Sequence, residues 1–163
     1  MEDHEFFYAV RVENLPEPDK FKDYFMSFIR RDTNFQTSYK PVLLQAMITL
    51  ADDEGQVRIT DLVKAFRDFY LDRQRQGKTI EVPTAFMVEV DRKTDREITQ
   101  RIFEMPFEKY ESRGLLGRTR DLDYVAFPPA VWNNLSPDEK AEIRGIATKR
   151  IVEYYNKHVP GSY

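Results

Sequence analysis

The chain of 163 residues contains no cysteine, and this absence excludes some classes of protein and of metal site. It can form neither a disulfide framework nor a thiolate metal site, which favours an intracellular location. No stretch reaches the roughly 18 apolar residues that a membrane span requires. The opening segment, MEDHEFFYAV, is acidic, whereas a secretory signal peptide begins with basic residues. These features predict a cytoplasmic protein without a membrane anchor.

The chain also lacks the basic excess that is typical of non-specific nucleic-acid binders. It carries 25 basic and 28 acidic residues, for a formal net charge of −3. Any contact with DNA must therefore be local or be supplied by a larger partner. Aromatic residues are plentiful, with 12 Phe and 9 Tyr, and we expect them chiefly in the core and at interfaces.

Motifs for catalysis and for cofactors are missing as well. The two histidines, His4 and His158, lie near opposite ends, and neither has the spacing of a metal site or a catalytic triad around it. No glycine-rich phosphate loop occurs. One alternative stays open: VEVDRK places Asp91 and Lys93 as an acid-x-Lys pair, a pattern found in metal-dependent nucleases. No matching upstream aspartate is evident, so we expect no enzyme activity, no metal and no cofactor.

Apolar residues recur at helical spacing along most of the chain. Helices are expected to begin after LPEPD with Asp19 as a cap, at Ser38, at Thr60, at Thr94, at Pro106 and at Ser136. Strands are expected at residues 56–59, at 85–90 and in a hairpin of residues 115–127, whose charged tip spans 118–121. Two capping boxes, Thr94 with Glu97 and Ser136 with Glu139, strengthen two of the helix starts.

This order of elements predicts a mainly α fold with a small β-hairpin (α+β). It is the order of a winged-helix-like core, with extra helices at the N- and C-terminal ends. Residues 1–37 would form an arm and a helix that pack on this core. Residues 38–163 would form the winged-helix-like part, and the whole chain would make one compact domain.

Two surfaces could bind a partner. Cations that could contact DNA lie on the helix pair and at the hairpin tip: Arg96, Arg101, Lys109, Arg113, Arg118 and Arg120. Glutamates share the same helices, so the helical face could equally be an ordinary solvated one. The competing hypothesis is a protein–protein docking module, with an aromatic-rich first helix as the docking surface: Phe21, Tyr24, Phe25 and Phe28.

Several segments resemble one family. SYKPVLLQAMITL is similar to a helix of bacterial restriction and phage-defence proteins, where it occurs beside HNH nuclease domains and after DEAD/DEAH-box helicase cores. FRDFYLDRQRQGKTIE, IFEMPFEKYESRGLL and VAFPPAVWNNLSPDEKAEI are similar to other segments of the same group. The resemblance covers about residues 38–157.

The resemblance implies an accessory domain of a restriction or antiviral defence system. Such a domain would act on double-stranded DNA beside a larger helicase or nuclease. This chain contains neither ATPase motifs nor HNH histidines, so the partner's activity is not transferred to it. The DNA sequence or modification, the partner enzyme and the oligomeric state, including a homodimer, stay open.

Overall fold

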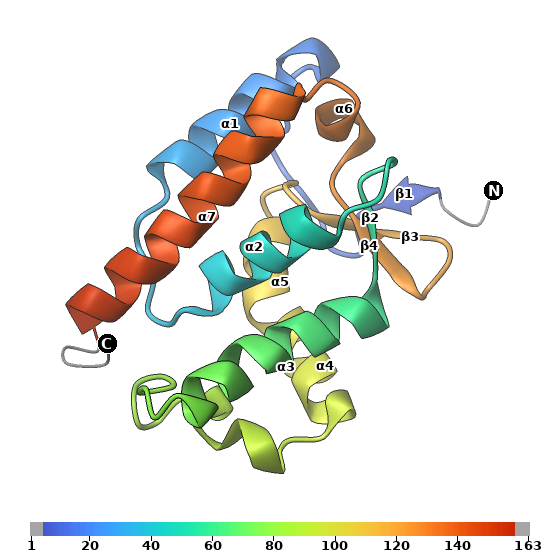
Figure 1. The fold of residues 1–163 in the computed structure, drawn as a ribbon. Helices are drawn as coiled ribbons and strands as arrows, with labels where there is room; N and C mark the ends of the chain where they lie inside the picture. Colours follow the sequence, from blue (N-terminus) through green and yellow to red (C-terminus); the bar gives the residue numbers. More distant parts are fainter. Residues whose placement is uncertain (1–4, 159–163) are drawn as a thin grey trace.

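The computed structural model describes residues 5–158 and shows a mainly helical protein with one small antiparallel sheet (Figure 1). The predicted α+β class is therefore confirmed. The α-helices are α1 (Phe21–Arg31), α2 (Tyr39–Leu50), α3 (Ile59–Arg75), α4 (Asp95–Glu104), α5 (Pro106–Glu111), α6 (Pro129–Trp132) and α7 (Pro137–His158). Two 3₁₀ helices are η2 (Pro18–Lys20) and η3 (Phe86–Arg92). The strands are β1 (Phe6–Phe7), β2 (Gln56–Arg58), β3 (Gly117–Thr119) and β4 (Tyr124–Ala126).

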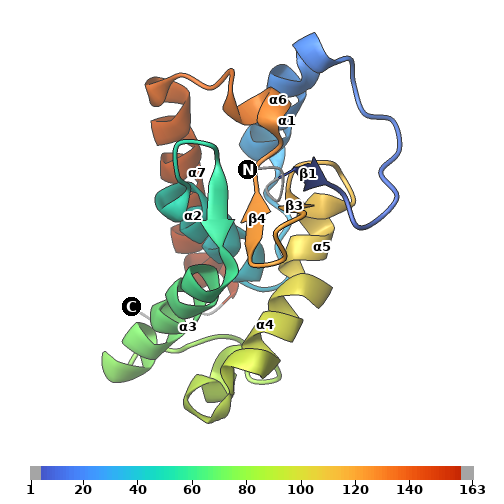
Figure 2. The same cartoon turned by 90° about the vertical axis from the view of Figure 1, so that its right-hand side faces the viewer.

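The sheet has the order β1-β3-β4-β2, and every pair in it is antiparallel. β3 and β4 form the predicted hairpin, in which Arg118 lies opposite Val125. β2 pairs with the other edge of β4, and β1 adds the N-terminal arm to the free edge of β3. Figure 2 shows the arm leaving β1 in a wide loop before it reaches α1.

Helix α2 lies at the centre of the core because its sequence is apolar nearly all round. Leu43 and Met47 are completely buried, and α7 and α3 pack against this helix. The long helix α7 runs beside α1 and α2 (Figure 1). Its start is fixed by the predicted capping box: the Ser136 N–H donates to Glu139 (2.9 Å), and the Glu139 N–H donates to Ser136 (3.1 Å).

Some local predictions were wrong. The segment predicted as a strand at 85–90 is helical from Phe86 onward, in η3, because burying Met87 and Val90, three residues apart, suits a helical turn. Asp19 does not cap α1, which continues directly from η2. The hairpin tip lies two residues later than expected, at residues 120–123, because Arg118 and Thr119 belong to β3 itself.

Ser38 occupies the N-cap position of α2, but its side chain bonds elsewhere. Its N–H and its hydroxyl both donate to the buried carboxylate of Glu81, at 2.8 and 2.5 Å. The Tyr154 hydroxyl donates to the same carboxylate, and Tyr70 lies 2.7 Å from the Ser38 hydroxyl. Burial raises the pKa of both tyrosines, so they stay neutral donors. Glu81 thereby connects the segment between α3 and η3 to the start of α2 and to α7.

None of the helices within residues 5–158 combines the length and the apolar character needed to cross a membrane.

Phe127 and Trp132 are buried and stacked, with ring centroids 5.2 Å apart. Trp132 also donates from its indole N–H to the Asp53 carbonyl (3.0 Å). These contacts hold the segment after β4 against the turn before β2.

Candidate nucleic-acid interface

Helix α5 lies between two of the surfaces on which candidate cations are found: Arg118 is on one side of it, and Lys109 and Arg113 are on the other. Pro106 starts α5 directly after Met105, whose backbone (φ −116°, ψ −86°) is not helical, so α4 and α5 meet at a kink. Residues four apart share one side of a helix, whereas residues two apart lie on nearly opposite sides. Phe107 and Glu111 therefore lie on one side of α5, and Lys109 lies on the other. Arg113, in the turn after α5, lines the same groove as Lys109.

The inward side of α5 contains a buried ion pair. The Glu111 side chain is 0% exposed and accepts two hydrogen bonds from the Arg118 guanidinium, each of 3.1 Å. The backbone N–H of Ala9 donates to the same carboxylate (2.8 Å). The guanidinium also lies 4.8 Å from the centroid of the Phe103 ring. Arg118 therefore neutralises a buried charge and links the hairpin, α5 and the arm.

Arg120 at the hairpin tip is exposed and is also paired within the chain. Its guanidinium lies 3.1 Å from the Glu5 carboxylate, and the backbone N–H of Arg120 donates to the Glu5 carbonyl (2.9 Å). The arm packs closely on the hairpin beside it: a Cβ added at Gly117 would lie 2.3 Å from the Phe6 ring. The two hairpin arginines predicted for DNA contact thus both have carboxylate partners in the fold.

The cations of α4 lie on a surface of mixed charge. Arg96 is exposed, and the Arg101 guanidinium lies 4.4 Å from the centroid of the Phe86 ring. Asp95 on the same helix pairs with Arg67 (2.6 Å), and Glu97 closes the capping box with Thr94. Both glutamates expected to compete with these cations on α4, Glu97 and Glu104, are exposed.

The outward side of α5 borders a groove of about 240 Å³. We call it the basic groove; it is lined by Asn34, Gln36, Thr37, Tyr39, Lys40, Met105, Pro106, Lys109 and Arg113. No acidic side chain is among these lining residues. Within residues 5–158, no carboxylate forms a salt bridge with Lys109 or Arg113. The structure therefore brings together two of the six candidate cations, one helical turn apart, beside a cavity.

Neighbouring groups position the cations of this groove. Arg113 donates from Nη1 to the Lys109 carbonyl (3.0 Å), and its guanidinium lies 5.5 Å from the Phe28 ring. Tyr24 donates from its hydroxyl to the Arg113 carbonyl (2.8 Å). Lys40 differs from both cations because its ammonium lies 2.8 Å from the Asp32 carboxylate. The excess positive charge of the groove therefore comes from Lys109 and Arg113.

The aromatic helix α1 does not offer the exposed surface expected of a docking site. Phe21 and Phe25 are only 7% and 1% exposed and belong to the core. Tyr24 and Phe28 are half-buried and contact Arg113, as described above. The aromatic spacing of this helix thus produces core packing and support for the basic groove.

Sequence reasoning missed one wall of the groove. Asn34, Gln36 and Thr37 lie in the connection before α2, whose sequence has no helical or strand periodicity that would mark it as a binding segment.

The described residues add no support for the nuclease alternative. Asp91 is exposed at the end of η3, and residues 5–158 contain no cluster of His, Asp and Glu side chains able to hold a metal ion.

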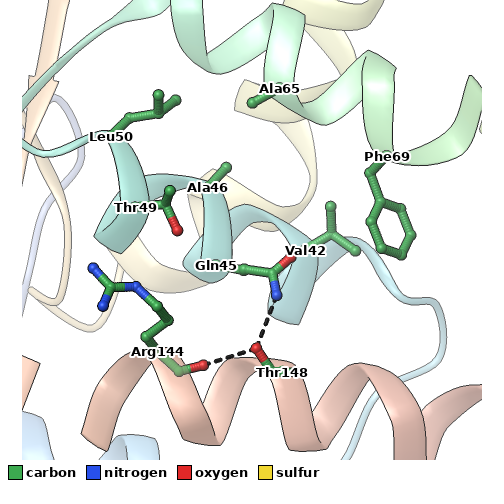
Figure 3. A pocket seen from close by; sticks show the side chains of 9 residues that line it. All are labelled: Val42, Gln45, Ala46, Thr49, Leu50, Ala65, Phe69, Arg144 and Thr148. Atoms are coloured by element: carbon green, nitrogen blue, oxygen red, sulfur yellow. Dashed lines mark hydrogen bonds between the residues drawn. The ribbon is translucent and has the colours of Figure 1, made fainter. Parts of the chain in front are cut away.

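A larger groove of about 340 Å³ lies between α2, α3 and α7 (Figure 3). We call it the apolar groove; its apolar lining is Val42, Ala46, Leu50, Ala65 and Phe69. At its edge, Gln45 donates to the Thr148 hydroxyl (2.9 Å), which donates to the Arg144 carbonyl (3.0 Å). Arg144 is the sole titratable residue of this lining, so the groove is suited to an apolar side chain rather than to chemistry.

Comparison with known proteins adds no assignment. No protein-family model matches the chain, and neither the curated proteins nor the solved structures contain a significant match. Function is therefore inferred from the order of the elements and from the geometry of the two grooves.

Proposed function

We propose that this chain is a non-catalytic module that binds double-stranded DNA and positions it for a larger helicase or nuclease. The observation that carries the proposal is the pair Lys109 and Arg113, which faces the basic groove without a carboxylate partner within residues 5–158. Cations four residues apart suit neighbouring phosphates, and contacts to phosphate oxygens and sugars make up about half to two-thirds of protein–DNA hydrogen bonds.

The order of elements supports the same proposal. From α2 to β4 the chain runs helix, strand, helix, kinked helix pair and hairpin, and β2, β4 and β3 are neighbours in the sheet. This arrangement fits a winged-helix-like core, in which the pair α4–α5 takes the place of the recognition helix. The segments that resemble restriction and phage-defence proteins favour a role in such a bacterial system.

The net charge of −3 limits how strongly the module can bind DNA alone. Two phosphate contacts give a weak, salt-sensitive interaction, so the affinity of the assembly would come mainly from the partner. The module would then contribute orientation rather than most of the binding energy.

A salt titration of duplex binding tests the proposal. Fluorescence anisotropy with a labelled 20-base-pair duplex should give a slope of log K against log salt of about −2, because two contacts release about 0.9 counterions each. The double variant Lys109→Ala/Arg113→Ala should remove binding and keep the fold. The matched control, Lys149→Ala/Lys157→Ala, removes two exposed cations of α7 and should bind the duplex like the wild type. Binding by the double variant at wild-type strength would overturn the proposal.

The apolar groove favours a second candidate, a protein-docking module without DNA contact. Leu50 at this groove is 37% exposed, and no acidic residue is in its lining, so it suits an apolar partner side chain beside a carboxylate that pairs with Arg144. If the wild-type chain binds no duplex at low salt, this candidate replaces the first. Ala65→Glu should then weaken association with the purified partner enzyme, measured by calorimetry, and unchanged association would exclude it.

A further inference from the structure

We propose that the basic groove holds a single unpaired nucleotide of a DNA strand. The base would lie against Met105 and Pro106, its polar edge would face Asn34 and Gln36, and its phosphate would lie between Lys109 and Arg113. This inference rests on the proposed function and specifies which part of the DNA enters the groove.

The size of the groove sets an upper limit on its ligand. Its volume of about 240 Å³ lies below the range of about 300–1,000 Å³ typical of pockets that enclose a drug-sized molecule. A duplex can place only a backbone phosphate against the cations at the edge of such a groove, whereas one base with its phosphate is small enough to lie inside it. A base at a strand end enters at least cost, because it has little stacking to lose.

The kink between α4 and α5 supplies an apolar wall. Met105 lies at the break in the helix and is 41% exposed, beside Pro106, which lines the same groove. Its thioether is flexible and polarisable, so it adapts to the flat face of a base. An exposed apolar side chain in the same groove as two cations suits single-stranded nucleic acid, because a base can pack on the apolar surface while its phosphate pairs with the cations.

A second segment of the lining, in the connection before α2, carries side-chain amides. Asn34 and Gln36 are exposed in the connection before α2, and each offers both a donor and an acceptor. Neither amide has a side-chain hydrogen bond to another residue within 5–158. An amide that presents a donor beside an acceptor complements the edge of a base, which phosphate contacts alone cannot recognise.

The two cations lie where they can hold a phosphate next to that base. Arg113 is restrained by its hydrogen bond to the Lys109 carbonyl and by the Phe28 ring, so it is held beside Lys109. Lys40, already paired with Asp32, adds little net charge. A groove that combines apolar, amide and cationic side chains matches the three parts of a nucleotide better than it matches a bare anion.

The experiment compares three DNA probes by anisotropy on the full chain at low salt: a blunt 20-base-pair duplex, the same duplex with one unpaired thymidine at a 3′ end, and that duplex with an abasic overhang. The unpaired thymidine should tighten binding about 5-fold, the lower end of the range for stacking of one base on an aromatic ring, because Met105 and Pro106 are not aromatic. The abasic overhang should bind like the blunt duplex. Poly-glutamate should not compete at equal charge.

Variants then locate the preference. Asn34→Ala/Gln36→Ala and Met105→Glu should each remove the preference for the overhang. Gln74→Ala/Gln76→Ala, a pair of exposed amides beyond the groove, should change nothing.

Each other outcome overturns the inference. Equal affinity for blunt and overhanging duplexes would overturn it and leave the proposed function standing. A preference that survives the Asn34→Ala/Gln36→Ala and Met105→Glu variants would place the nucleotide elsewhere. Competition by poly-glutamate would make the groove a general anion site. Failure to bind any probe would overturn the proposed function as well.

Discussion

The cations on the two sides of α5 differ in whether the fold already pairs them with a carboxylate. On the inward side, Arg118 contacts a fully buried glutamate and two aromatic rings. On the outward side, Lys109 and Arg113 line a groove and form no salt bridge within residues 5–158. In the sequence, Arg118 at the hairpin is a candidate DNA ligand in the same way as Lys109 and Arg113. In the fold, Arg118 stabilises the structure and the two helix cations remain for a ligand.

The difference shows that a cation is available for binding only if its charge is not already balanced in the fold. A buried carboxylate such as Glu111 is costly to leave unpaired, so the fold depends on Arg118. An exposed lysine such as Lys109 balances no such charge. Substitutions on the two sides of α5 should therefore separate stability from binding.

The largest effect should follow Arg118→Ala. It leaves the Glu111 carboxylate buried with a single backbone donor, which should lower the free energy of unfolding by about 3 kcal/mol, the lower end of the range for a broken buried pair. The measurement is urea denaturation followed by circular dichroism. Lys109→Ala, on the other side of α5, should change the unfolding midpoint little.

A double variant separates the charge from the contacts. Arg118→Met/Glu111→Gln removes both charges and keeps an acceptor for the Ala9 N–H. It should recover most of the lost stability, because a neutral pair in place of a buried ion pair is often well tolerated. If the double variant is no more stable than Arg118→Ala, the buried charge is not the cause.

A smaller effect should appear at alkaline pH. Burial raises the pKa of Tyr39, in the basic groove, from 10.0 to about 12, and burial also raises the pKa of Tyr8 in the arm. Above pH 10 the unfolded chain releases these protons while the folded chain keeps them, so stability falls as pH rises. For Tyr39 the loss is about 1.4 kcal/mol per pH unit between pH 10 and 12.

Urea denaturation at pH 9, 10 and 11 measures this slope. Tyr39→Phe removes the titrating group, so its stability should fall less steeply with pH than that of the wild type. Tyr8→Phe should flatten the slope in the same sense and so compare the arm with the groove. Equal slopes for the wild type and Tyr39→Phe would show that this phenol is not protected from ionisation.

The smallest effect should follow Arg120→Ala. Its pair with Glu5 is solvent-exposed, and exposed pairs contribute at most about 1 kcal/mol. Thermal unfolding should shift only slightly, and duplex affinity should remain as in the wild type. A large loss of duplex affinity would show that the hairpin tip contacts DNA. It would also contradict the difference inferred between the two sides of α5.

Local patterns predicted most of the helices correctly. The continuous apolar run of α2, the capping boxes at Thr94 and Ser136 and the break at Pro106 all depend on residues close together in the chain. The prediction for 85–90 failed because alternating valines favour a strand only when a neighbouring strand is present. Here the segment packs against α3 instead.

The candidate site was predictable only in part. The six cations could be named from the sequence, but their partners could not, because Glu5 lies 115 residues from Arg120 and Lys109 faces a connection about 70 residues away. The exposed Met105 and the amides of Asn34 and Gln36 belong to no motif. They form a groove with the cations only after α2 and α5 pack together.

The sequence by itself determined the helical class, the positions of most helices and the hairpin, since spacing, caps and turn residues act over a few positions. Tertiary structure alone decided which charges are balanced. Arg118 pairs with a buried glutamate, whereas Lys109 and Arg113 line the basic groove. Burial and charge pairing depend on segments that meet only when the chain folds.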